Sequence, residues 1–209
     1  MNKLILIIFI ILPAALFAQS PNAPVSNASI TPIDTTQKDP VKPPQSKDID
    51  PDTGLNTGYY IGDNLSMVKG FSRFYKLMDA AGLTETFRSR GPITVFIPTN
   101  EVLAKLSAGK TDSLLMTDNL PELIALVSYH AIPGKLTFGK IAKQIDGKTG
   151  LATFTTLSGG KLYAKYDGNR NLVLVDETGR QARVTREDIK QHNGLFNVID
   201  TVLQPKNKL

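Results

Sequence analysis

Apolar residues between positions 65 and 81 recur one, three and four places apart, which is the spacing of one face of a helix. Asp63 and Asn64 precede this segment as candidate caps, and Gly82 follows it as a stop signal. Shorter helices are predicted over residues 99–108, 112–116 and 119–129, and Thr137 is expected to cap another that contains Ile141. The predicted apolar face of the first helix consists of Met67, Val68, Phe71, Phe74, Tyr75 and Met78.

A different pattern separates the first two of these helices. Residues 93–97 form an apolar-rich run, and Pro98 closes it because proline cannot donate to a strand ladder. Thr99 and Asn100 follow at once, and both residue types are favoured at helix starts. The segment therefore predicts a buried strand that turns sharply into a helix.

In the second half of the chain the period changes from helical to strand-like. Residues 151–157, 161–166, 171–176 and 181–185 are predicted strands, separated by turns rich in Gly, Asn and Asp. A last run, residues 195–203, is apolar on both faces and is expected at the centre of a sheet. Helices followed by an antiparallel meander predict one α+β domain of about 140 residues, spanning 65–205.

The first 18 residues are expected to lie outside this fold. Lys3 precedes an apolar run and Ala18 precedes polar residues, which is the layout of a cleaved secretory signal peptide over residues 1–18. The alternative is a retained membrane anchor. The apolar run over residues 4–17 is shorter than the ~20 residues that a span needs, and Pro13 interrupts it, which favours cleavage.

Residues 19–64 are predicted to be a disordered, proline-rich linker. Seven prolines lie between Pro21 and Pro51, among polar residues and few large apolar ones. Such a segment cannot bury enough surface to offset the entropy of ordering it. Residues 206–209 are expected to form a short basic tail.

Charge and cysteine content add two constraints. The net charge is +5, with three lysines against six aspartates in residues 19–64 and 18 Lys and Arg against 13 acids in residues 65–205. A basic domain is suited to anionic surfaces such as acidic polysaccharide, although such an excess also serves plain solubility. The chain has no cysteine, so an exported domain would rely on its core alone and would carry no lipid-modified cysteine.

Three segments, residues 94–101, 126–135 and 193–205, together resemble the fasciclin domain family in order and spacing. The first holds the strand-to-helix turn, the second a tyrosine–histidine pair with a Pro-Gly turn, and the third the closing apolar strand. The resemblance covers residues 65–205. It marks as structural motif residues Thr94, Phe96, Pro98, Thr99, Asn100, Pro133, Gly134, Asn193, Gly194 and Asp200.

The resemblance implies a fasciclin-like fold in which N-terminal helices pack on a wedge of two β-sheets. It also implies a role in cell adhesion and matrix contact without enzyme activity. Tyr129 and His130 match the pair that has been proposed to engage integrins in some animal members. Two interpretations of His130 stay open: a hydrogen-bonded core residue at the end of a helix, or a binding residue.

Asp200 is a carboxylate within an otherwise apolar predicted strand. An unpartnered buried charge is costly, so Asp200 is expected to accept hydrogen bonds from backbone or hydroxyl groups, with Thr201 as one donor. The role of Asp200 is therefore interpreted as architectural.

No enzyme signature rises above chance in this sequence. The two histidines, His130 and His192, lie far apart and lack the spacing of a metal site, so no metal and no cofactor are predicted. Asp48, Asp50 and Asp52 resemble the start of a calcium loop, but the glycine and the closing acid are missing. Asn27 and Asn64 begin glycosylation sequons.

The sequence therefore predicts an exported, non-catalytic binding module, secreted, periplasmic or extracellular. Its expected partners are an extracellular or cell-surface protein or a polysaccharide, with no nucleic acid and no stable membrane span after signal cleavage. The alternatives are an exported hydrolase or small-ligand carrier, and a passive structural protein of the envelope. The basic residues offered as a contact surface are Lys161, Lys165, Arg170, Arg180, Arg183 and Arg186, of which Lys161, Lys165, Arg170 and Arg183 join Tyr129 and His130 as predicted binding residues.

Overall fold

The computed structural model describes residues 48–89, 91–106 and 109–206. Contacts divide the chain between residues 39 and 40, and all the described residues belong to the second unit. The predicted signal peptide 1–18, linker residues 19–47 and tail residues 207–209 lie outside the described residues.

Seven strands form one sheet in the order β2-β1-β7-β6-β5-β4-β3. Strands β1 and β7 pair in parallel, and the other neighbours pair antiparallel. The strands are β1 (Ile93–Pro98), β2 (Ala131–Pro133), β3 (Ala152–Thr155), β4 (Lys161–Tyr166), β5 (Leu172–Val175), β6 (Gln181–Gln191) and β7 (Gly194–Ile199).

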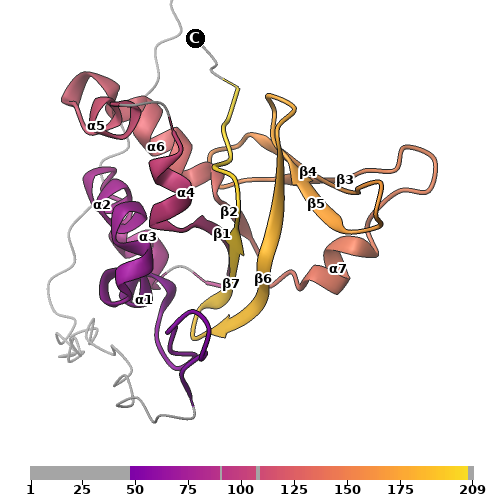
Figure 1. The fold of residues 1–209 in the computed structure, drawn as a ribbon, viewed down its shortest axis with the longest axis horizontal. Helices are drawn as coiled ribbons and strands as arrows, with labels where there is room; N and C mark the ends of the chain where they lie inside the picture. Colours follow the sequence, from indigo (N-terminus) through magenta and orange to yellow (C-terminus); the bar gives the residue numbers. More distant parts are fainter. Residues whose placement is uncertain (1–47, 90, 107–108, 207–209) are drawn as a thin grey trace, which may run out of the picture. The chain divides into compact units, whose positions relative to one another are not determined.

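Strand β6 divides this sheet into two halves (Figure 1). Residues 181–183 pair with β5, whereas residues from Val184 to Gln191 pair with β7. The register shifts on both sides of Arg186, and Asp188 has a φ of 56°, so the strand is irregular where it passes from one half to the other. The predicted α+β fold is thereby confirmed, and the two predicted sheets correspond to the two halves of one sheet, joined by β6.

Most helices lie on one side of β1 and β7, and one lies beside the other half of the sheet (Figure 1). The first group is α1 (Ile61–Met67), the 3-10 helix η2 (Lys69–Phe71), α2 (Ser72–Ala80), α3 (Thr84–Ser89), α4 (Asn100–Ala104), α5 (Lys110–Leu114), the 3-10 helix η3 (Thr117–Asn119) and α6 (Leu120–Tyr129). The remaining helix is α7 (Phe138–Ala142). None of the helices within the described ranges has the length and apolar content needed to cross a bilayer.

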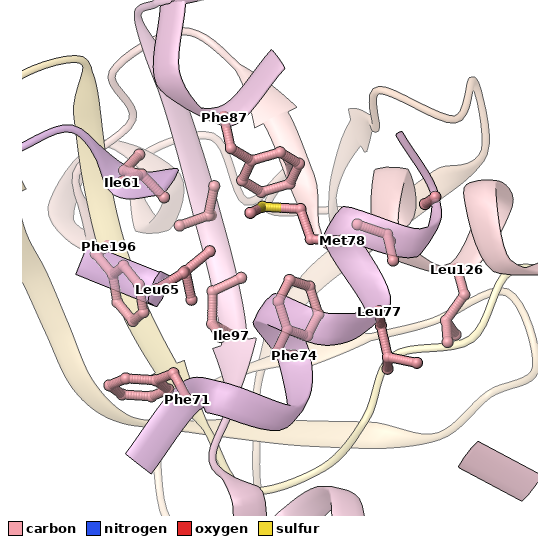
Figure 2. Close-up of a cluster of buried hydrophobic side chains, with 14 of the residues drawn as sticks. Ile61, Leu65, Phe71, Phe74, Leu77, Met78, Phe87, Ile97, Leu126 and Phe196 are labelled. Carbon is pink, nitrogen blue, oxygen red and sulfur yellow. The ribbon is translucent and has the colours of Figure 1, made fainter. Parts of the chain in front are cut away.

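Two apolar cores hold these elements together. The larger joins the helices to β1 and β7, and in it the rings of Phe71 and Phe196 meet edge-on at 5.1 Å (Figure 2). The smaller lies inside the curve of the sheet and includes Phe96, Phe154 and Leu162. Because β1 contributes to both cores, all six of its residues are buried, which explains its unbroken apolar run.

The start of the packed structure differs from the sequence-based boundary. Leu55 and Ile61 have no exposed surface and belong to the helical core, although both fall in the predicted linker. Asn64 is also buried, between the backbone of Asn56 and the side chain of Gln191. Residues 48–64 are therefore structured, and the prediction that they are disordered linker is wrong.

The predicted first helix is broken in the structure. Val68 takes an extended conformation between α1 and η2, and Met67 is 61% exposed instead of facing the core. Helix α3 and strand β2 were not predicted. Among the strands, the predicted range 161–166 has the same bounds as β4, whereas β6 runs six residues beyond the predicted end at residue 185.

Candidate binding surface

The tyrosine–histidine pair closes helix α6 and points inward. Both Tyr129 and His130 have no exposed surface. The Tyr129 hydroxyl donates to the carbonyl of Lys161 and accepts from the backbone N–H of Glu177 at 3.0 Å. Burial raises the pKa of Tyr129 well above its usual range, so the hydroxyl stays protonated.

His130 joins helix α6 to the chain that follows β7. Its Nδ1 donates to the carbonyl of Leu126 at 2.8 Å, and its Nε2 accepts from the backbone N–H of Leu203 at 3.2 Å. The Phe74 ring packs edge-on against it at 5.3 Å. Burial lowers the pKa of His130 to about 4, so the imidazole is neutral at physiological pH.

This geometry favours the structural interpretation of the pair. Every side-chain polar atom of Tyr129 and His130 is occupied by main-chain groups of the domain. Neither side chain presents surface to a partner in this structure. Their predicted role as direct contacts therefore conflicts with their burial, and they tie α6 to β4, to the turn between β5 and β6, and to the C-terminal segment.

The remaining motif residues build the turns around β1. Thr94 donates to the carbonyl of Gly134 and accepts from the N–H of Leu136, which fixes the turn after β2. Thr99 caps α4 through the N–H of Val102, and Asn100 binds the backbone around η2 and α2. Phe96 and Pro98 belong to buried β1, while Pro133 is exposed at the end of β2.

Asn193 and Gly194 open the last strand. The Asn193 side chain accepts from the N–H of Ile61 and donates to the carbonyl of Phe87, so it joins α1 and α3 to the sheet. At Gly194 a Cβ atom would lie 1.8 Å from the carbonyl oxygen of Ile93, so only glycine fits the close parallel approach of β7 to β1.

Two sequence-based expectations need correction here. Asp200 lies just beyond β7 and is exposed, so it is not a buried carboxylate. Its partners are nevertheless those expected: it accepts from the N–H of Arg183 at 2.8 Å and from the Thr201 hydroxyl at 3.0 Å. Asn64, the start of a sequon, has its amide fully engaged in the interior, so it is inaccessible to glycosylation in the folded domain.

The predicted basic residues do not gather in one place. Arg180 pairs with the buried carboxylate of Asp176 at 3.3 Å, and Arg186 pairs with Asp50 and Asp52 at 3.0 and 2.6 Å. Two of the six predicted contact residues, Arg180 and Arg186, are therefore held in ion pairs within the domain. Arg170 lies in the turn between β4 and β5, where its φ is 63°.

Lys161, Lys165 and Arg183, by contrast, share one face of the sheet. Residues Lys161 and Lys165 alternate along β4, and the pairing places Val173 beside both Lys165 and Arg183. The opposite face of these strands carries the apolar residues of the smaller core. We call the set on the other side the basic sheet face, made up of Thr153, Thr155, Lys161, Tyr163, Lys165, Val173, Val175, Gln181 and Arg183; Val173 is buried, and the other members are exposed or half-buried.

The basic sheet face is positive with an aromatic centre. None of its members is Asp or Glu, and Tyr163 lies between Lys161 and Lys165, whose Cα atoms are about 13 Å apart along the extended strand. Arg183 has Asp167 at 3.6 Å, from the adjoining turn. Cations in a row on an open β-surface suit an extended anionic chain more than a small enclosed ligand.

The residues that the structure describes contain no cluster of three or more His, Cys, Asp or Glu side chains able to hold a metal ion. The two rings nearest to such chemistry, His130 and His192, lie on different elements, and His192 stacks at 4.4 Å on Tyr60.

The family model described as Fasciclin domain matches residues 69–205 of this chain. The chain belongs to the Fasciclin domain family. The match begins within η2 and ends beyond β7, so it spans the elements that position the buried tyrosine–histidine pair and the basic sheet face.

Relatives of this Fasciclin domain occur in distant organisms. Protein sll1483 of Synechocystis sp. is 32% identical over 136 residues, which cover 65% of this chain and 67% of that protein. The transforming growth factor-beta-induced protein ig-h3 of Sus scrofa is 34% identical over 148 residues, 69% of this chain but 20% of that protein. The fasciclin-like arabinogalactan protein elcF of Phaeosphaeria nodorum is 26% identical over 71% of this chain and 43% of its own length.

A solved structure shares the fold. A FAS1 domain pair from the insect cell adhesion molecule Fasciclin I superposes with a TM-score of 0.51 and 22% identity, over 65% of this chain and 45% of that one. This likeness supports the fold of the Fasciclin domain alone.

Within the Fasciclin domain, the sequence interpretation did not single out two aromatic residues of β4, the half-buried Tyr163 and the exposed Tyr166. Tyr163 lies in the basic sheet face, and Tyr166 is 50% exposed at the end of β4. The alternation of Lys161, Tyr163 and Lys165 could have revealed the first, because residues two apart on a strand share a face. Tyr166 could not be placed from sequence, since its exposure depends on where α7 packs.

Proposed function

We propose that this protein is an exported, non-catalytic adhesion module that contacts an anionic polysaccharide through the basic sheet face. The observation that carries the proposal is the row of Lys161, Lys165 and Arg183 around Tyr163, with no acid among the members of that face. Membership of the Fasciclin domain family supports a binding role, as does the relative named as a fasciclin-like arabinogalactan protein.

The physical argument is one of multiple weak contacts. Single exposed ion pairs contribute about 0–1 kcal/mol each and are screened by salt. A polymer that contacts several cations at once gains the sum of these contributions, but it loses the entropy of association only once. Polysaccharide rings also offer C–H surface to the aromatic side chain at the centre of the face.

The test is binding of the purified protein to immobilised polygalacturonate at rising salt. Replacing Lys161, Lys165 and Arg183 together by Gln should weaken binding by roughly tenfold or more. The matched control replaces Lys76, Lys105 and Lys143, three exposed lysines of other elements, and removes the same charge. Equal losses in both triple variants would show net charge at work, and unchanged binding in the face variant would refute this surface.

A further inference from the structure

Beside the basic sheet face lies a hollow between α7 and strands β4 to β6. Its volume is about 780 Å³, within the range of about 300–1,000 Å³ that is usual for ligand pockets, and it opens broadly to solvent. Tyr166, half exposed, and Arg170 both line it. Phe138 and Leu172 add apolar surface to its lining.

Arg170 is unusual for its turn. The three hairpins of the meander are closed by the same pair of backbone hydrogen bonds. The N–H of residues Gly159, Arg170 and Gly179 donates to the carbonyl three positions earlier, at 3.0 Å in each hairpin. These three residues have φ values of 80°, 63° and 86°.

Glycine occupies the left-handed position in two of these turns, as expected, because a side chain there crowds the backbone. The turn between β4 and β5 alone of the three carries a side chain at that position, and the side chain lines the hollow. A departure from local preference, kept at a cost in stability, is expected where the side chain has a function.

The charge of the Arg170 guanidinium is available to a ligand. No ion pair to Arg170 is present among the described residues, whereas the neighbouring Asp167 is engaged by the backbone of its own turn and by Arg183. Guanidinium groups prefer carboxylates, which they bind through two parallel hydrogen bonds.

The other residues that line the hollow determine which anions it can bind. Glu187 and Asp200 also line the hollow, and burial raises the pKa of Glu187, with Asp188 adding to the effect. The two carboxylates would repel a compact anion, and they and the amide oxygen of Asn171 can accept hydrogen bonds from hydroxyl groups. The ligand should therefore combine one carboxylate with several hydroxyls and an apolar face.

We propose that this hollow binds one carboxylated pyranose unit, a uronic acid residue, with its ring against Tyr166 and its carboxylate on Arg170. The inference rests on the proposed polysaccharide-binding function and deepens it. The basic sheet face would hold the polymer by charge, and the hollow would recognise the chemistry of one sugar unit within it.

The experiment measures the binding of galacturonic acid trimer by calorimetric titration. It compares the unaltered full-length protein with its Arg170→Gly variant. The variant should lose roughly tenfold or more in affinity, the usual effect of removing a charged hydrogen bond. Its melting temperature should stay unchanged or rise, because glycine relieves the left-handed position. Asn169→Gly, in the same turn, is the matched control and should bind normally.

Further arms separate the ring from the charge. Tyr166→Ala should weaken trimer binding, while Tyr166→Phe should retain it, since stacking needs no hydroxyl. A neutral galactose trimer should bind more weakly than the uronic trimer and be insensitive to Arg170→Gly. A polyglutamate peptide that binds as tightly as the uronic trimer would overturn the sugar assignment.

The outcomes distinguish the two proposals. If Arg170→Gly and Tyr166→Ala bind the trimer normally, the hollow is not the subsite, whatever the polymer does. Arg183 lines the hollow as well as belonging to the basic sheet face, so here the face is tested with Lys161 and Lys165 alone replaced by Gln. If the hollow variants lose the trimer while this double variant still binds long polygalacturonate, the hollow stands and the proposed face fails. If the unaltered protein binds neither probe, both proposals are wrong.

Discussion

A buried, uncharged imidazole at position 130 couples the fold to pH. Its folded-state pKa of about 4 lies below the ordinary value of 6.5, so the unfolded chain binds the proton more readily than the folded one. The stabilisation is fully present above pH 6.5 and is lost as the pH falls toward 4. Sequence alone left the role of His130 open, because whether a histidine is buried depends on the chain that covers it, here the segment at Leu203.

We expect the free energy of unfolding to fall by about 3 kcal/mol between pH 7 and pH 4 through His130. His130→Gln keeps one donor and one acceptor but does not titrate, so the variant should lack this part of the pH dependence. Urea unfolding at pH 7, 5.5 and 4 measures it. Parallel curves for the two proteins would contradict the buried, neutral state.

At the scale of elements, the parallel contact between β1 and β7 depends on Gly194. Because a Cβ there would lie 1.8 Å from the Ile93 carbonyl, Gly194→Ala must push the strands apart. We expect a loss of roughly 3 kcal/mol or more in unfolding free energy. Gly168→Ala, where no heavy atom lies within 4 Å of the added Cβ, is the control and should cost far less. Melting curves of both variants decide the matter.

How well elements could be predicted follows from how local their signals are. β4 has the predicted bounds, since its alternation of polar and apolar residues directly reflects its two faces. The helix predicted over 65–81 breaks at Val68, because the packing of η2 overrides helical periodicity there. Helix α3 escaped prediction since Phe87 is the one large apolar residue within it. The predicted β6 was cut short because its second half is rich in charged residues and lacks a regular alternation of apolar and polar positions.

The same distinction between local sequence signals and tertiary contacts applies to the candidate binding surface. Lys161, Lys165 and Arg183 were predicted as binding residues from charge alone, and the register explains why they lie together. Arg180 pairs with Asp176, four residues earlier, whereas Arg186 pairs with Asp50, which only the fold brings near. Arg183 also has a partner, Asp167 at 3.6 Å, so charge alone identified the cations but not which of them are paired.

For the whole molecule, the segment before the predicted boundary matters most. Leu55 and Ile61 are fully buried, Asn64 bridges to Gln191, and Asp50 pairs with Arg186, so residues 48–64 contact the core and the sheet at several points. Proline-rich composition concealed this, because sparse apolar residues give no periodic signal even when each is buried. Burying the Leu55 and Ile61 side chains contributes about 3–6 kcal/mol, a large share of the 5–15 kcal/mol typical of a domain.

Two shortened chains test this boundary. A chain of residues 48–209 should melt within a few degrees of the full-length protein, since it keeps every described contact. A chain of residues 65–209 should be strongly destabilised or unfold, because it loses Leu55, Ile61 and the Asp50 ion pair together. Leu55→Ala in the full chain should cost about 2–5 kcal/mol, and Met67→Ala, at a largely exposed apolar position, should cost little. If residues 65–209 melt like the full chain, the segment 48–64 adds nothing to stability. The domain would then begin where the apolar periodicity begins.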